Sequence, residues 1–141
     1  MSSRVIRDLR VGLQSEQANM PHIKNALQLD KIKRSMGKFA HYDFIGTKDD
    51  DKIIVELKTR NIKFNQYPTV FINLCKMEYF KQVLDKNIKC YLFYKFNDGL
   101  YHFEVTLANI NAYLLDHYCS PSNKQSVCSI KMNDLTKVIS M

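Results

Sequence analysis

Two acidic residues and a lysine are spaced so that they could act together on a phosphate. Asp43 stands at the head of an apolar run, and Glu56-Leu57-Lys58 ends a second apolar run beyond an acidic turn. Residues two apart in a strand point to the same side, so Glu56 and Lys58 share a face. If the two runs pair as a hairpin, Asp43 reaches that face as well. Two carboxylates beside an ammonium group suit metal-assisted attack of water on a phosphodiester.

A plainer interpretation competes with this one. Glu-x-Lys is a weak signal in a chain with 21 Lys plus Arg, because it also forms the solvated side of an amphipathic strand. The adjacent acids Asp49-Asp50-Asp51 are typical of a solvated hairpin end, and we leave them out of the predicted site. The order of elements favours the functional interpretation: a helix with an acid, a strand with an acid, an apolar strand ending in Glu-x-Lys, then a long helix and more strands.

In this pattern the chain resembles the PD-(D/E)XK nuclease superfamily, whose fold many restriction enzymes and some junction resolvases share. Asp43 matches the acid of the motif, and Glu56-Leu57-Lys58 matches its Glu-x-Lys. The resemblance covers about residues 12–104. Tyr42 stands where the name-giving proline would be, which is a departure at the least constrained position of the motif.

The resemblance implies a role for each motif residue. Asp43 and Glu56 would coordinate Mg²⁺ or Mn²⁺, with the Leu57 carbonyl as an additional oxygen ligand. Lys58 would orient or activate the attacking water and offset negative charge in the transition state.

Members of the superfamily often carry two further groups. One is an acid on the first helix, where Glu16 lies, and it would act through water or as another ligand. On the residues alone, Glu16 is equally well a solvated helix acid. The other is a lysine on the helix after the motif strand, where Lys76 falls off the apolar stripe and would contact a phosphate.

A loop that follows the motif strand mixes positive charge with aromatic residues. We assign nucleic-acid binding to four of its residues, Arg60, Lys63, Gln66 and Tyr67, because this composition suits gripping a backbone and stacking on bases. The alternative is that the aromatic side chains anchor the loop to the core.

Composition agrees with a nucleic-acid partner. The chain has 141 residues, enough for one domain, and its 21 basic and 14 acidic residues give a net charge of +7. Such an excess favours a polyanionic partner, nucleic acid above all, although evenly scattered lysines would serve solubility alone. No apolar run approaches the ~20 residues of a membrane span, and no signal peptide is apparent, so we expect an intracellular protein, cytoplasmic or nuclear, without a membrane partner. The Lys-, Ile- and Asn-rich composition favours an AT-rich genome such as that of a virus or phage.

Four cysteines are widely spaced, at Cys75, Cys90, Cys119 and Cys128, without a Cys-x-x-Cys pair. We therefore expect reduced, mostly buried thiols and not a zinc or redox site.

Periodicity and the order of elements predict an α/β sandwich with a central mixed sheet and helices on both faces, and the resemblance implies that the fold is restriction-endonuclease-like. The expected helices are one in the first third that kinks or restarts near Asn19 before Pro21, one over 70–86, one over 111–118 and a short terminal one. The expected strands are a basic edge strand within 29–38, then 41–46, 52–60, 89–96, 100–107 and 127–132, with Asn97-Asp98-Gly99 as a hairpin turn in which Gly99 has positive φ.

These observations predict a Mg²⁺- or Mn²⁺-dependent DNA endonuclease. The chain is short for a separate recognition domain, so we expect it to select junctions, nicks or ends over a long sequence, and resolvases of this fold suggest a homodimer. The alternatives are a non-catalytic nucleic-acid-binding subunit and an RNA endonuclease. The intact acid–acid–lysine set favours catalysis, because binding a phosphate does not require carboxylates.

Overall fold

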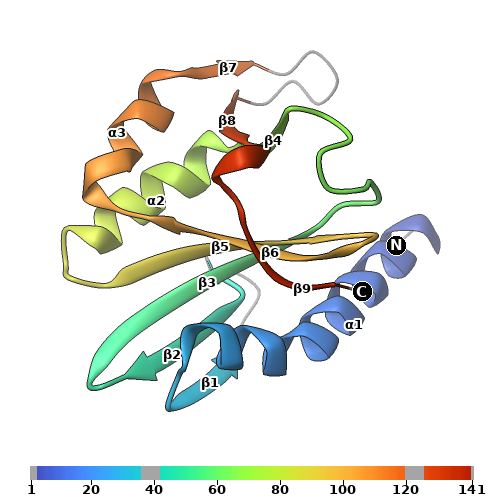
Figure 1. The fold of residues 1–141 in the computed structure, drawn as a ribbon, viewed down its shortest axis with the longest axis horizontal. Coiled ribbons are helices and arrows are strands. Elements are labelled where there is room, and N and C mark those ends of the chain that lie inside the picture. Colours follow the sequence, from blue (N-terminus) through green and yellow to red (C-terminus); the bar gives the residue numbers. More distant parts are fainter. Residues whose placement is uncertain (1–2, 36–41, 120–125, 141) are drawn as a thin grey trace.

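The computed structural model of the chain describes residues 3–35, 42–119 and 126–140, with the backbone alone described for residues 3–12 and Cys119 (Figure 1). Along the chain the elements are α1 (Ser3–Leu27), β1 (Lys31–Arg34), β2 (Phe44–Lys48), β3 (Asp51–Thr59), β4 (Thr69–Asn73), α2 (Leu74–Leu84), β5 (Lys89–Phe96), β6 (Gly99–Val105), α3 (Leu107–Leu115), β7 (His117–Cys119), β8 (Ser126–Lys131), a 3₁₀ turn (Met132–Asp134) and β9 (Thr136–Ser140).

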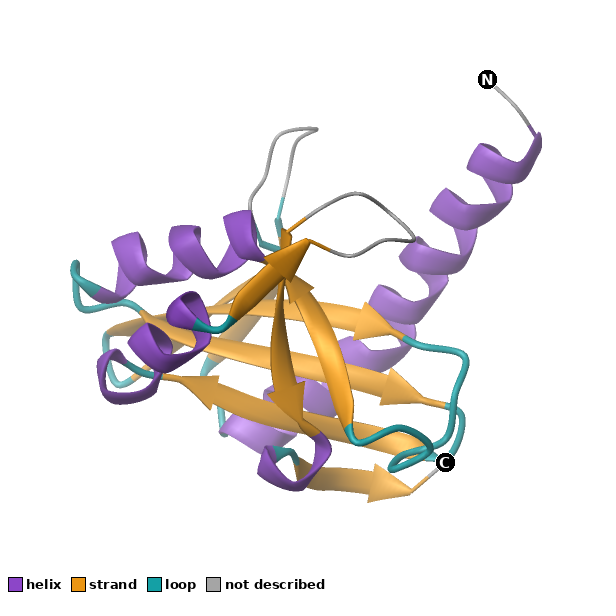
Figure 2. Cartoon of the chain, turned by 90° about the horizontal axis from the view of Figure 1, so that it is seen from above, coloured by secondary structure: helices purple, strands orange, loops and turns teal. Residues whose placement is uncertain are grey.

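A six-stranded mixed sheet forms the centre of the molecule, with the strand order β1-β2-β3-β5-β6-β9. Strands β3 and β5 are parallel and the other neighbours are antiparallel. A second sheet, in the order β4-β8-β7, runs across the larger one (Figure 2). This arrangement confirms the predicted α/β class with a central mixed sheet.

Different helices cover the two faces of the large sheet (Figure 1). On one face, Ile23 and Leu27 of α1 pack in a buried cluster with Phe44 and Val55. On the other face, α2, α3 and the second sheet enclose a larger cluster that includes Phe80, Ile110, Ile130, Leu92 and Tyr94. Alternate residues of β3 therefore enter different cores. Among the described residues, none of the helices combines the length and apolarity needed to cross a bilayer.

Of the kink or restart predicted near Asn19, the restart is wrong. Helix α1 continues through Pro21, which lies inside it. Ile23 and Leu27, in the turns after the proline, are almost completely buried against the sheet. This packing offsets the backbone hydrogen bond that proline cannot make.

Two further predicted helices are also corrected. The predicted helix over 70–86 begins as a strand, because residues 69–73 alternate between exposed and buried and β4 pairs with β8. The expected terminal helix is the short 3₁₀ turn followed by β9, which extends the large sheet beside β6. β-branched residues in 136–139 suit that strand. The helix predicted over 111–118 starts four residues earlier, where Thr106 and Asn109 form a capping box.

Thiols occur as expected within the described side chains: Cys75, Cys90 and Cys128 are free, and the last two are buried. The start of the strand predicted at position 41 and the end of the one predicted within 29–38 lie outside the described residues.

Gly99 is needed for space and not for a positive φ. Its φ lies outside the left-handed region, and it pairs with Ser140 of β9. A Cβ at this position would lie 2.7 Å from the backbone oxygen of Ile139. Only a glycine therefore lets β9 pair this closely with β6.

We predict that Gly99→Ala lowers the free energy of unfolding by about 1–3 kcal/mol, because the added methyl group meets a backbone atom that cannot move alone. Urea unfolding measures the loss. Gly46→Ala is the control, since its Cβ would meet chiefly the flexible end of Leu29, 2.6 Å away, and should cost less. Equal losses in the two variants would contradict this explanation.

Candidate active site

The hairpin of β2 and β3 brings Asp43 beside Glu56. Phe44 pairs with Val55, and one step further the backbone N–H of Asp43 donates to the Val55 oxygen at 3.0 Å. The side-chain Oδ2 of Asp43 accepts a hydrogen bond from the backbone N–H of Leu57 at 2.7 Å. This contact fixes the first carboxylate against the strand that carries the second, as the expected hairpin requires.

Glu56 is a charged residue inside the sheet. Only 4% of it is exposed, and its strand lies between β2 and β5. Lys58 Nζ lies 3.1 Å from Glu56 Oε1, and Lys76 Nζ lies 3.2 Å from Oε2. Lys58 comes from the same strand face and Lys76 from the first turn of α2. A buried carboxylate is costly unless it is paired, so the two ammonium groups are what allow this position to be acidic.

One oxygen of Glu56 is only partly satisfied. Oε2 is buried and has no hydrogen-bond donor among the described residues, although Lys76 Nζ is close enough for an ion pair. We take the ion pair as real, because charge attraction at 3.2 Å does not need hydrogen-bond geometry. The Lys76 ammonium therefore compensates the charge of this oxygen without making a hydrogen bond to it.

The pKa of Asp43 is raised from 3.8 to about 7. The largest cause is burial, followed by the negative charge of Glu56; Glu16 adds to the rise. The Leu57 N–H and the Lys58 ammonium oppose it, because both favour the ionised form. Asp43 therefore changes charge close to neutral pH, and a bound cation would favour its ionised form.

Glu16 lies at the rim of this cluster. Its Oε2 is 3.1 Å from Arg34 Nε in a partly exposed ion pair, and its charge contributes to the raised pKa of Asp43. The hydroxyls of Ser15 and Thr59 lie 2.6 Å apart, which ties α1 to the end of β3. Arg34 was not among the predicted site residues. The alternation of residues 31–34 could have placed it on the side of α1, opposite Lys33.

The four predicted loop residues follow the end of β3. Arg60 Nη1 donates to the Thr59 oxygen at 3.2 Å, and the backbone N–H of Lys63 donates to Gln66 Oε1 at 3.0 Å. Tyr67 is 54% exposed. Within the described residues, none of the four forms a hydrogen bond or ion pair with the two carboxylates. Phe64 anchors this loop, because its ring stacks on that of Tyr101 with the ring centroids 4.1 Å apart.

Asp43 and Glu56 suit an open cation site. Among the described residues, no group of three or more His, Cys, Asp or Glu side chains forms a closed metal cluster. Two carboxylates are nevertheless what Mg²⁺ commonly takes from a protein, with waters and substrate phosphates completing its shell. Glu56 Oε2, which lacks a hydrogen bond within the described residues, and Asp43, whose ionised form a cation would favour, fit such an ion.

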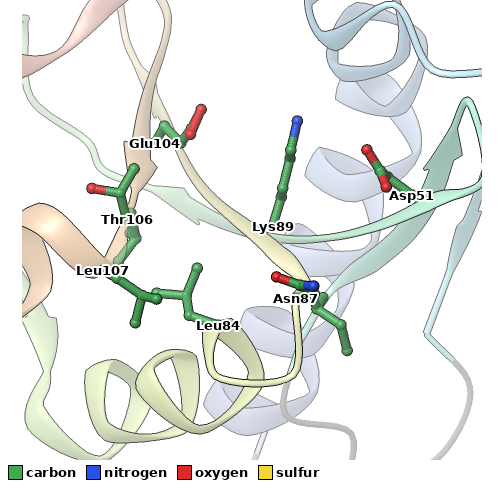
Figure 3. A pocket seen from close by; sticks show the side chains of 9 residues that line it. Asp51, Leu84, Asn87, Lys89, Glu104, Thr106 and Leu107 are labelled. Carbon is green, nitrogen blue, oxygen red and sulfur yellow. The ribbon is translucent and has the colours of Figure 1, made fainter.

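A separate hollow of about 400 Å³ lies at the other end of β3. Figure 3 shows Lys89 extending between Glu104 and Asp51 there. Glu104 accepts a hydrogen bond of 2.8 Å from the Tyr91 hydroxyl. This hollow lacks a pair of adjacent buried acids, so we do not assign catalysis to it.

Comparisons with known proteins found matches that cover most of the chain. Residues 11–138 match the model of a family described as "Phage putative PDDEXK endonuclease". Among solved structures, a 1.6 Å structure of Hjc from Archaeoglobus fulgidus, described as a Holliday junction resolvase from an archaeal hyperthermophile, aligns over 92% of this chain and 88% of that one, with 12% identity and a TM-score of 0.47. No curated protein sequence matches.

We predict that Asp43→Asn changes how stability depends on pH. The folded pKa of about 7 exceeds the unfolded value of 3.8, so the stabilising effect of the protonated acid is complete below pH 4 and is lost as the pH rises through 7. The asparagine cannot ionise, so in EDTA the variant should gain relative stability from pH 5 to pH 8, by at least about 1 kcal/mol.

Urea unfolding at several pH values measures this effect. Asp50→Asn, in the exposed turn, is the matched control and should follow the wild type. An Asp43→Asn variant with the same pH dependence as the wild type would contradict the raised pKa of Asp43.

Proposed function

We propose that this chain, which belongs to the family described as "Phage putative PDDEXK endonuclease", is a Mg²⁺- or Mn²⁺-dependent endonuclease that hydrolyses phosphodiester bonds in DNA. The observation that carries the proposal is the buried Glu56 carboxylate, which two lysines contact and which raises the pKa of the neighbouring Asp43.

The cost of this arrangement favours catalysis over binding alone. Glu56 is buried and Asp43 beside it is partly buried, so desolvation and the repulsion between the two acids raise the pKa of Asp43, which lowers stability at neutral pH. A protein that only bound nucleic acid would gain nothing from carboxylates that face a phosphate. Perturbed acids with specific charged partners are typical of functional sites. The non-catalytic binding subunit therefore remains the second candidate.

Each residue of the cluster has a proposed role. Asp43, Glu56 and the Leu57 carbonyl would hold the cation, which when bound acts as a Lewis acid toward a phosphate oxygen. Lys58 would orient the attacking water and offset the charge that builds on the phosphate. A substrate phosphate would offer both Lys58 and Lys76 a second acceptor besides Glu56.

Residues around the cluster would serve the substrate. Glu16, held by Arg34, would act through water or as a further ligand. Lys76 would contact the scissile or a neighbouring phosphate, and the loop with Arg60, Lys63, Gln66 and Tyr67 would grip the strand beyond it.

The preferred substrate forms the finer part of the proposal. We propose branched, nicked or end-containing DNA, with RNA as the alternative, because the same chemistry serves both backbones. One cluster can cut one strand at a time, so a homodimer would supply one site for each of two strands. The family description and the Lys-, Ile- and Asn-rich composition both support a phage source.

We predict that cleavage requires a divalent cation. Protein incubated with labelled branched, nicked, linear and single-stranded DNA, and with matched RNA, should cut in Mg²⁺, stop in excess EDTA and resume when Mn²⁺ is added in excess. Full activity in EDTA would overturn the metal-dependent mechanism, and cutting confined to RNA would replace the substrate.

We predict that Lys58→Ala lowers single-turnover cleavage by about 10²-fold or more, the scale expected for losing one preorganised electrostatic group. DNA affinity should change little. Because Lys58 lowers the pKa of Asp43, the pH of half-maximal cleavage should also rise in the variant. Lys137→Ala, an exposed change on the far edge strand, is the control and should cleave normally. Unchanged cleavage in Lys58→Ala would leave the lysine as a partner of Glu56 alone and favour the binding subunit.

A further inference from the structure

A groove of about 640 Å³ lies along the edge strand β1, and four lysines line it. Lys31 and Lys33 come from β1, Lys52 from the start of β3, and Lys24 from the last turn of α1. The acid in the groove, Asp30, accepts a hydrogen bond of 2.9 Å from the backbone N–H of Asp49. The groove is therefore strongly basic.

Strand register places three of these lysines on the same face as the candidate active site. Lys31 lies opposite Thr47, which lies opposite Lys52, and directly opposed residues of antiparallel strands share a face. Along β3, residues 52, 54, 56 and 58 alternate onto that face, so Lys52 is in line with Glu56 and Lys58. Lys33 is two residues from Ser35, and the backbone N–H of Ser35 donates to the backbone carbonyl oxygen of Asp43. Lys33 therefore also lies close to the candidate active site.

The spacing along this face matches a nucleic-acid strand. Glu56 is four positions after Lys52 on β3, about 13 Å at ~3.3 Å per residue. Each DNA strand carries a phosphate about every 3.4 Å of helix axis, so Lys52 lies about four nucleotides from Glu56. Lys33 lies opposite Ile45, two residues from Asp43, and is therefore about two nucleotides from that acid. On the face that carries the lysines, the strands that α2 packs against are chiefly β5, β4 and β8. The helix that packs against β1 is α1, and it lies on the opposite face of the sheet.

The three lysines of β1 and β3 are available to bind a charged partner. Lys31, Lys33 and Lys52 are exposed, and among the described residues none of them forms an ion pair with a carboxylate. The lysines of the active site differ, because both contact Glu56. A row of like charges repels itself unless a polyanion lies along it.

We propose that Lys31, Lys33 and Lys52 bind the phosphodiester backbone of the DNA that flanks the cut, about two to four nucleotides to one side of the scissile phosphate. This inference rests on the proposed endonuclease function for its direction, because the acids define where the cut lies. It adds a second contact region, separate from the loop that follows β3.

The test compares two triple variants with the same change in net charge. The groove variant is Lys31→Gln, Lys33→Gln and Lys52→Gln; the control is Lys81→Gln, Lys86→Gln and Lys137→Gln, all exposed and outside the groove. Binding to labelled duplex DNA is measured by anisotropy in EDTA over a range of salt concentrations, after circular dichroism has shown that both variants fold. Each phosphate contact contributes about 0.9 to the slope of log affinity against log salt.

The groove variant should lose about 2–3 units of slope, and the control should keep the slope of the wild type. Single substitutions should each lose about one unit, which provides the same test if a triple variant does not fold. Once the cut is mapped, shortening the duplex to fewer than about two base pairs on the side of the groove should abolish the difference between wild type and groove variant.

Equal slopes in the wild type and the groove variant, equal losses in the two triple variants, or no DNA binding by the wild type would each overturn the inference. Cleavage of the same DNA in Mg²⁺ is measured in parallel. If the wild type cuts the DNA and the groove variant keeps the wild-type slope of log affinity against log salt, the groove proposal is wrong and the endonuclease proposal stands. If the groove variant loses slope but the wild type cuts in neither Mg²⁺ nor Mn²⁺, the endonuclease proposal is wrong and the groove still binds DNA.

Discussion

One buried charge constrains the arrangement around it. Glu56 lies inside the sheet, where a carboxylate is stable only if positive groups reach it. Lys58 reaches it from the same strand, two residues away, but Lys76 must come from another element. The chain provides it by starting α2 directly after β4, so that the first turn of the helix meets β3. The connection from β3 to β5 thus serves both the sheet topology and the charge balance of Glu56.

The same charge fixes the register of the sheet. A shift of β3 by one residue would turn Glu56 and Lys58 toward α1, into the cluster of Phe44, Val55 and Ile23. It would also bring Leu57 to the side of Lys76. Either change buries an uncompensated charge, so the polar site and the apolar cores specify one pairing. The hydrogen bond from the Leu57 N–H to Asp43 depends on that pairing too.

Local sequence was enough to predict the centre of the site but not its surroundings. The apolar runs on either side of an acidic turn predict the β2–β3 hairpin, and alternation places Glu56 with Lys58. The helical stripe after residue 73 correctly leaves Lys76 off the buried side. By contrast, β4 and β9 are short, and each is a strand because of a partner far along the chain, β8 and β6. The ion pair of Glu16 with Arg34 also depends on contacts between distant parts of the chain, because Arg34 reaches Glu16 only once β1 packs against α1.

The raised pKa of Asp43 shows why electrostatics could not be deduced from the motif alone. Its largest cause is burial, which the packing of the whole domain determines, and its second cause is a neighbour thirteen residues away. The net charge of +7 hides a similar division. Lys58 and Lys76 offset a buried acid, whereas Lys31, Lys33 and Lys52 form no ion pair with a carboxylate of the described residues. Lysines of the first kind are required by the fold and lysines of the second kind are not, so a DNA-binding surface is sought among the second.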